Sequence, residues 1–193
     1  METNVLIFIF FLLISISVIV KNLDSKKHIN FFWFCDFAPF LFALAFLVKD
    51  VQLVKALINV GLFGQIMTFT GVVPTRFREW KKGKLLQGYF YVAVEFIIHL
   101  TAVIALILTY SIKPTFQSLV YSLILLIFIF VITLIFTSSK DNINVIYYLE
   151  FDYGRIKKRF KLPYHLYLWI FYGMVLSLIA YLIQYSLYLF AMN

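Results

Sequence analysis

The sequence predicts an all-α, polytopic membrane protein with six transmembrane helices in one domain. Of its 193 residues, 63% are hydrophobic and 13% are charged, whereas soluble domains run at roughly 45–50% apolar and 25% charged. Charged clusters divide the long apolar runs into segments of about the length that crosses a bilayer. We therefore expect a single transmembrane domain over residues 1–193 and exclude a soluble enzyme.

Six helices are expected, near residues 4–20, 31–48, 52–73, 89–110, 116–136 and 164–190. The first should be retained, because it lacks the basic start and the small-residue cleavage site of a secretory signal peptide. The second, fourth and fifth are apolar runs bounded by charge. The third is the least apolar and should face other helices; it contains Lys55, Asn59, Gly61, Gly64 and Gln65. The sixth would be about 40 Å long, so it must tilt or project from the bilayer.

Basic residues are concentrated in three of the connections between these helices. All of the 17 Lys and Arg residues except Lys49, Lys55 and Lys113 lie between the first and second, the third and fourth, or the fifth and sixth helices. Short basic loops stay on the cytoplasmic side, so we expect these loops inside and both termini outside, in the plasma membrane. We then expect the basic residues behind the net charge of +8 to contact membrane lipids, through the anionic headgroups of the inner leaflet. The sequence contains no nucleic-acid-binding motif.

Several polar residues are expected at similar depth inside the bilayer. Cys35 and Asp36 lie about one turn above the cytoplasmic boundary, while Glu95 and His99 lie one turn apart on one face of the fourth helix. Gln65 belongs to the same inner half. An ionisable side chain that faces lipid costs ~2.5–3.5 kcal/mol, so Asp36, Glu95 and His99 should meet around a partly wet cavity.

These residue types suit acyl transfer. An imidazole takes the proton of a neighbouring thiol, and a carboxylate orients the imidazole. Cys35 is the candidate nucleophile, His99 the base, and Glu95 or Asp36 the orienting carboxylate. Because Cys35 is the only cysteine, the chain can form neither an internal disulfide nor a Cys-based metal cage. No nucleotide-binding or zinc-binding motif occurs, so we expect no metal and no cofactor.

A family resemblance points the same way. The segment Phe34-Cys35-Asp36-Phe37, the glycines of the third helix, His99 and the motif Asn142-Ile143-Asn144 together resemble the YwaF-like family of multi-pass membrane proteins, over roughly residues 30–190. That family includes an animal branch of Cys-dependent acyltransferases that form ether phospholipids. The resemblance implies that Cys35 accepts the acyl group and that His99 is its base.

The loop that carries this motif supplies further candidates. Asn144 matches the Asn of the family's Asn-Tyr segment, although Val145 replaces the Tyr, and Trp33 stands where the family has a His. The candidate substrate-binding residues are Gln65, Asn142 and Asn144. The same loop, residues 137–163, mixes tyrosines with basic residues, a composition that favours anchoring at the headgroup level.

Two other functions fit the same residues. A small proton-coupled carrier would use Asp36, Glu95 and His99 as a relay, with the glycines of the third helix permitting rocking of packed helices. A membrane scaffold protein would use the polar residues only to join helices. An enzyme should fail on Cys35→Ala, whereas a carrier should tolerate that change and fail on Asp36→Asn or Glu95→Gln. No oligomeric state follows from the sequence.

Overall fold

The structure is a computed structural model that describes residues 2–24, 28–81, 88–138, 144, 148–152, 157–161 and 164–193. Its helices are α1 (Glu2–Asp24), the 3-10 helix η1 (His28–Phe32), α2 (Phe34–Leu47), α3 (Val51–Lys81), α4 (Gly88–Ile98), α5 (Thr101–Thr109), α6 (Phe116–Phe136) and α7 (Tyr164–Met192). Two short strands, β1 (Tyr148–Asp152) and β2 (Lys157–Lys161), precede α7.

The described helices are those of a helical membrane protein. Helices α1, α3, α6 and α7 each contain a stretch of 20 to 24 residues that is long and apolar enough to cross a membrane. Helices α4 and α5 together form one more such stretch, bent by 48° at its break. Helix α2 is apolar but has only 14 residues. Large apolar side chains are exposed along these helices, as contact with lipid requires.

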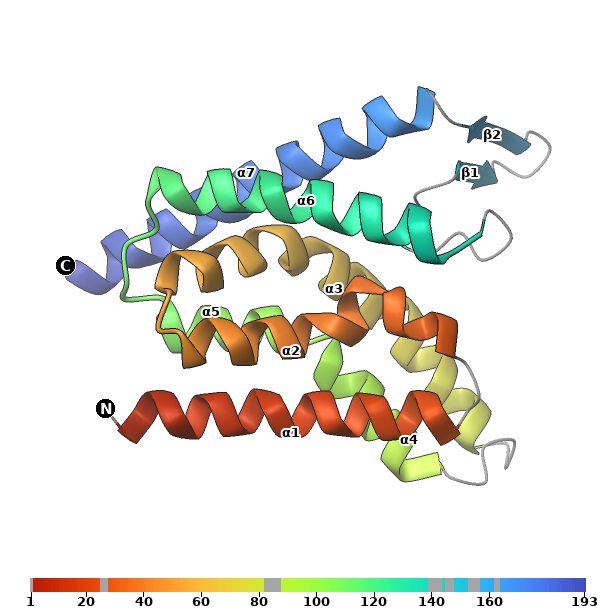
Figure 1. Ribbon diagram of the computed structural model, residues 1–193, viewed down its shortest axis with the longest axis horizontal. Coiled ribbons are helices and arrows are strands. Elements are labelled where there is room, and N and C mark those ends of the chain that lie inside the picture. Colours follow the sequence, from red (N-terminus) through yellow and green to blue (C-terminus); the bar gives the residue numbers. More distant parts are fainter. Residues whose placement is uncertain are drawn as a thin grey trace.

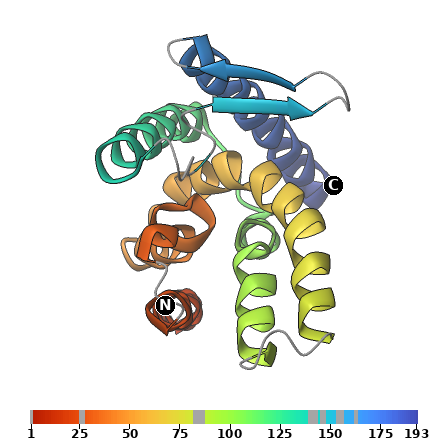
Figure 2. The same ribbon diagram turned by 90° about the vertical axis from the view of Figure 1, so that its right-hand side faces the viewer.

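The bundle has two distinct ends. Figure 1 shows both chain termini at one end and the β1–β2 hairpin at the other, with α3 between the α1–α2 pair and the α6–α7 pair. In the end-on view of Figure 2, the later part of α3 and helix α4 run side by side, away from α6 and α7. An edge-to-face contact between Phe69 of α3 and Phe96 of α4, 5.1 Å between ring centroids, joins these two segments.

The helix boundaries differ from the predicted ones where helices continue beyond the apolar runs. Helix α1 extends to Asp24, which brings Lys21 into the helix rather than into a loop. Helix α3 continues through Pro74 to Lys81. The prediction of one continuous helix over 89–110 is wrong, because this segment is divided into α4 and α5. Helix α6 has its predicted bounds.

One β-hairpin is added to the all-α architecture that the sequence predicts. Strands β1 and β2 pair antiparallel, with Glu150 opposite Arg159 and Asp152 opposite Lys157. The sequence Leu149-Glu150-Phe151-Asp152 alternates apolar and acidic residues, which is the period of a strand rather than of a helix. The hairpin lies within the loop that was expected to contact headgroups.

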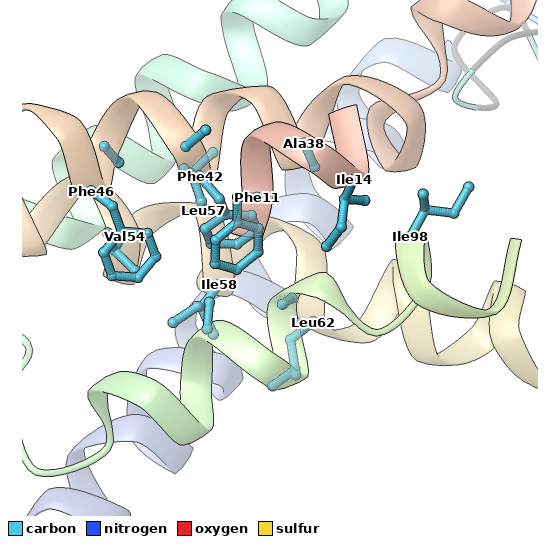
Figure 3. Close-up of a cluster of buried hydrophobic side chains, with 14 of the residues drawn as sticks. Phe11, Ile14, Ala38, Phe42, Phe46, Val54, Leu57, Ile58, Leu62 and Ile98 are labelled. Atoms are coloured by element: carbon cyan, nitrogen blue, oxygen red, sulfur yellow. The ribbon is translucent and has the colours of Figure 1, made fainter. Parts of the chain in front are cut away.

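The core that holds the first three helices together is aromatic. Phe11 of α1 stacks between Phe42 and Phe46 of α2, with centroids 5.2 Å and 5.5 Å apart. Leu57 and Ile58 of α3 are fully buried beside these rings, as Figure 3 shows. Such dense contact between helices is the main source of association in a membrane, where lipid chains are as apolar as the side chains.

A glycine allows the start of α2 to approach α3. A Cβ atom added at Gly61 would lie only 2.9 Å from Cε1 of Phe34, so only glycine fits without movement of the ring. At Gly64 an added Cβ would meet nothing within 4 Å. The two glycines of α3 therefore have different roles, and Gly61 determines how closely the N-terminus of α2 packs.

Candidate functional site

Three helices bring ionisable side chains together near the end of α1. Lys21 Nζ lies 3.3 Å from Oδ1 of Asp36 in α2 and 3.1 Å from Oε1 of Glu95 in α4. Asn22 Nδ2 donates a further hydrogen bond, 2.8 Å long, to Oδ2 of Asp36. Lys21 and Asp36 are 4% and 8% exposed. A charge this deeply buried is stable only when it is paired, and here one ammonium group links two carboxylates.

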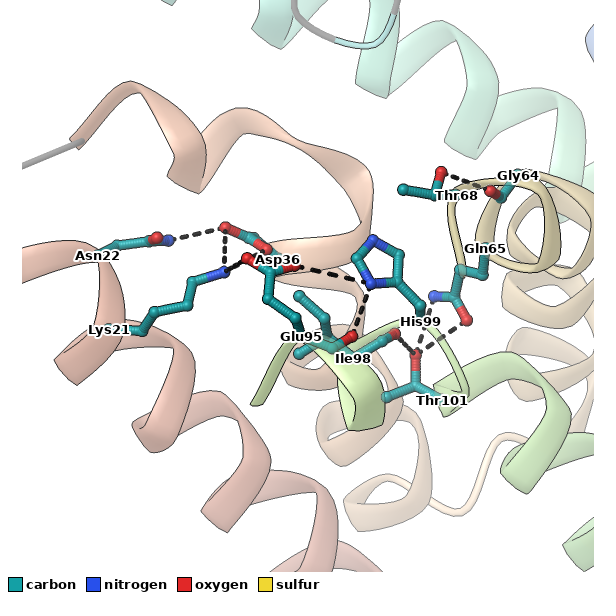
Figure 4. A network of polar contacts seen from close by, with 10 residues as sticks. All are labelled: Lys21, Asn22, Asp36, Gly64, Gln65, Thr68, Glu95, Ile98, His99 and Thr101. Carbon is teal, nitrogen blue, oxygen red and sulfur yellow. Dashed lines mark hydrogen bonds and ion pairs between the residues drawn. The ribbon is translucent and has the colours of Figure 1, made fainter. Parts of the chain in front are cut away.

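His99 extends this group along α4. Its Nδ1 lies 2.6 Å from the carbonyl oxygen of Glu95 and 3.7 Å from Oε2 of the same residue. Figure 4 shows the other ring nitrogen pointing away from Glu95. We call these four side chains the ionisable cluster: Lys21, Asp36, Glu95 and His99. Their convergence agrees with the prediction that Asp36, Glu95 and His99 meet.

The cluster lies against the break between α4 and α5, and Gln65 explains the break. Gln65 Oε1 accepts a hydrogen bond from the backbone N–H of Ala102, and Gln65 Nε2 donates to Thr101 Oγ1, each at 2.8 Å. Thr101 Oγ1 in turn lies 2.9 Å from the carbonyl of Ile98. Side chains thus replace the helical ladder, which is an established cause of a kink. Gln65, a predicted substrate-binding residue, thus caps α5 through Oε1 and binds the Thr101 hydroxyl through Nε2.

Cys35 occupies a different position from the other candidate catalytic residues. It is half-buried in the first turn of α2, next to Asp36 in sequence. The described part of the structure contains no hydrogen bond or ion pair between Cys35 and His99. The predicted nucleophile and base are therefore brought to neighbouring helices, but no polar contact joins them.

Asn144 is tied into the protein by its side chain. Its Oδ1 accepts a hydrogen bond from the backbone N–H of Phe34 at 2.8 Å, and its Nδ2 donates to the carbonyl of Phe32 and to Thr133 Oγ1. The backbone carbonyl of Asn144 accepts a hydrogen bond from Trp169 Nε1. Asn144 thus connects the start of α2 to α6 and α7. Asn142, the other predicted substrate-binding asparagine, lies outside the described residues.

No known protein family, characterised protein or solved structure matches this chain. The assignment of the candidate site therefore rests on the geometry of its residues alone. Among the described residues, no three His, Cys, Asp or Glu side chains are grouped so that they could hold a metal ion.

A second polar group lies nearer the end of the bundle that carries the termini. Lys55 of α3 is fully buried and donates a 2.6 Å hydrogen bond to the carbonyl of Thr109, at the end of α5. Gln184 of α7 donates to the carbonyl of Lys55 and to Oδ1 of Asn59, and Asn59 donates to Ser122 of α6. These hydrogen bonds join α3 to three other helices.

Sequence reasoning missed Lys21, the residue that connects the cluster. The apolar run of the first helix ends at Val20, so Lys21 was placed in the loop that follows. The polar residues one turn away on either side, Ser17 and Asp24, give no signal, because Asp24 is exposed and the buried face of α1 carries Ile14 and Val18.

Proposed function

We propose that the protein is a small proton-coupled carrier in which Asp36, Glu95 and His99 bind and pass protons. The observation that carries this proposal is the location of the ionisable cluster beside the break between α4 and α5. Secondary transporters bind substrate and coupling ions at discontinuous helices near the membrane midplane, and ionisable residues inside a membrane mark such pathways.

The proposed topology has six crossings, in which α2 and the α4–α5 pair each count as one, with both termini outside. Both termini lie at one end of the bundle (Figure 1), and this supports an even number of crossings. The basic loops then lie in the cytoplasm of a plasma membrane protein, and the ionisable cluster lies in the inner half of the bilayer, near inner-leaflet headgroups.

The geometry supports distinct proton-handling roles. The carbonyl of Glu95 can only accept, so Nδ1 of His99 carries a hydrogen and Nε2 is the site at which a proton is gained or lost. A proton on either carboxylate weakens its attraction for Lys21. Because Lys21 joins α1 and α2 to α4, protonation at the cluster changes how firmly α4 is held.

The test uses proteoliposomes that enclose a pH-sensitive dye. A panel of soluble amines, amino acids, sugars and organic acids is added outside, and we expect at least one solute to change the internal pH relative to protein-free vesicles. Glu95→Gln and Asp36→Asn should abolish that change. Asp50→Asn is the matched control, because Asp50 caps the start of α3 away from the cluster. No solute-dependent signal, or full signal in Glu95→Gln, would reject the proposal.

A lipid acyltransferase is the second candidate, and one observation favours it. Asn144, which the family resemblance implies, accepts a hydrogen bond from the backbone N–H of Phe34, the residue that precedes Cys35. The sulfur would attack an ester carbonyl of a phospholipid, forming a thioester and releasing a lysophospholipid.

Mass spectrometry separates the two candidates. Incubation with phospholipid should add one acyl chain to Cys35 if the protein is an acyltransferase, and hydroxylamine should remove it. Cys35→Ala should abolish the mass increase. An unmodified Cys35, together with solute-dependent proton movement in Cys35→Ala, supports the carrier and excludes the enzyme.

A further inference from the structure

The ammonium group of Lys21 is bound by the protein as a cationic ligand would be. Three carboxylate oxygens from two other helices surround it, at 3.3 Å and 3.5 Å in Asp36 and 3.1 Å in Glu95. Lys55, which is also buried, contrasts with Lys21, because it donates to a single backbone carbonyl, that of Thr109. Lys21 thus fills a site with the geometry of an ammonium-binding site.

The charges of this site are not balanced by Lys21 alone. Among the described residues, one ammonium group faces two carboxylates, and His99 Nδ1 lies 2.6 Å from the carbonyl oxygen of Glu95 and 3.7 Å from Oε2 of its carboxylate. The group therefore keeps a net attraction for cations while His99 is neutral. A proton or a second cation can complete it.

Lys21 is also placed so that it can leave. It lies in the last turn of α1, three residues before the helix ends at Asp24. A lysine near a helix end can extend its four-carbon stem to the membrane surface while its backbone stays in place. Departure of Lys21 alone would leave the buried carboxylate of Asp36 and the half-buried carboxylate of Glu95 without their cation, so another cation must replace it.

We propose that the position of Lys21 Nζ is the substrate site, that the substrate is a small primary-ammonium compound, and that Lys21 occupies the site when substrate is absent. This inference rests on the proposed carrier function and names its substrate class. The N–H donors of a primary ammonium reproduce the contacts that Lys21 makes with Asp36 and Glu95. Lys21 is then an internal competitor that keeps the empty carrier neutralised.

The first experiment measures thermal unfolding of Lys21→Ala in nanodiscs. We expect Tm to fall by about 5–15 °C, because the buried carboxylate of Asp36 and the half-buried carboxylate of Glu95 lose their cation. Methylammonium at about 100 times its Kd should then raise Tm by about 5–10 °C. NaCl and tetramethylammonium chloride at equal ionic strength should not, since neither supplies N–H donors. Lys55→Ala is the matched control: it also removes a buried lysine, and methylammonium should stabilise it much less, because Lys21 still competes for the site.

A second variant covers the case in which Lys21→Ala fails to fold. In Lys21→Cys/Cys35→Ser, position 21 carries the only thiol. Alkylation with 2-bromoethylamine displaces bromide and creates a lysine analogue of the original length, whereas iodoacetamide creates a neutral side chain. Aminoethylation should restore the Tm of Cys35→Ser, and carbamidomethylation should not. Equal effects of the two reagents would overturn the ammonium site.

The outcomes separate this inference from the carrier function. Stabilisation of Lys21→Ala by methylammonium supports the site, whether or not proteoliposomes transport. Equal stabilisation by methylammonium in Lys21→Ala and Lys55→Ala overturns it. Proton movement driven by organic acids or sugars but not by amines would keep the carrier and reject the substrate class named here.

Discussion

His99 Nδ1 lies 2.6 Å from the carbonyl oxygen of Glu95, one turn earlier on the same helix. A carbonyl oxygen has no hydrogen to donate, so this contact fixes the hydrogen of a neutral His99 on Nδ1. The same contact turns Nε2 away from the backbone of α4 (Figure 4). One hydrogen bond therefore determines both the tautomer of His99 and the direction in which it exchanges a proton.

This relationship predicts different results for two substitutions of His99. In His99→Asn the amide N–H2 replaces Nδ1–H and keeps the bond to the Glu95 carbonyl, so stability should change by less than about 1 kcal/mol. Proton movement should nevertheless be lost, because nothing replaces Nε2. His99→Leu removes the donor as well and should cost about 1–3 kcal/mol. Thermal unfolding and the dye assay check the two effects separately, and an active His99→Asn would contradict the role of Nε2.

The two carboxylates should contribute unequally to stability. Asp36 is more buried and accepts hydrogen bonds from both Lys21 and Asn22, whereas Glu95 retains partial exposure. We expect Asp36→Ala to cost about 3–5 kcal/mol, the usual consequence of breaking a buried ion pair, and Glu95→Ala to cost less. Denaturant or thermal unfolding of both variants in the same nanodiscs measures the difference. A larger loss in Glu95→Ala would contradict the burial argument.

Gln65 should determine the break between α4 and α5. Gln65→Leu has a similar volume but leaves the N–H of Ala102 without its acceptor, and we expect a loss of about 1–3 kcal/mol. Gln65→Glu keeps the acceptor and is the control for that hydrogen bond. Hydrogen exchange of the Ala102 amide provides a direct measurement, which should accelerate in Gln65→Leu only. An unchanged exchange rate would show that Gln65 does not cap α5.

The two glycines of α3 form a matched pair of substitutions. Gly64→Ala meets open space and should stabilise the helix by about 0.5–1 kcal/mol through its higher helix propensity. Gly61→Ala forces the Phe34 ring to move and should instead destabilise by about 1–3 kcal/mol. Thermal unfolding of the two variants should therefore give shifts of opposite sign. Shifts of the same sign would refute the close approach of Phe34 to α3.

Asn144 should contribute to the stability of the fold. Its side-chain amide makes three hydrogen bonds, and its backbone has φ of 53°, which Asn tolerates better than Ala. Asn144→Ala should cost about 2–4 kcal/mol, and Asn144→Gly should cost less, because glycine accepts this φ. Unfolding measurements on both check this. If Asn144 instead only binds substrate, Asn144→Ala will lower activity and leave Tm unchanged.

The membrane class and most helix positions could be predicted because lipid imposes a simple rule on long apolar runs. That rule predicted the bounds of α6, which has no charged residue. It does not mark a helix end where polar residues continue the helix, so Lys21 and Asp24 were placed outside α1. It also does not report the break after Ile98, which depends on Gln65, a residue more than thirty positions earlier.

For the candidate site, the sequence allowed a prediction of which residue types meet but not of the contacts that join them. Asp36, Glu95 and His99 were expected to meet because each is costly in lipid, and the structure brings them together. The partner that joins them was not predictable, because the contact between α1 and α4 links residues 74 positions apart in sequence. Whether Cys35 contacts His99 depends on which face of α2 is turned toward α4. No pattern in the sequence of this short apolar helix encodes that face.

In the proposed topology, in which α2 crosses the membrane, its short length should change the bilayer around it. Its 14 residues extend for about 21 Å, whereas the hydrocarbon core is about 30 Å thick. A hydrophobic mismatch of this kind is relieved when the bilayer thins locally. We expect headgroups and water to dip toward the start of α2, where Asp36 lies. The ionisable cluster would then reach the aqueous phase through deformed lipid, without a pore through the protein.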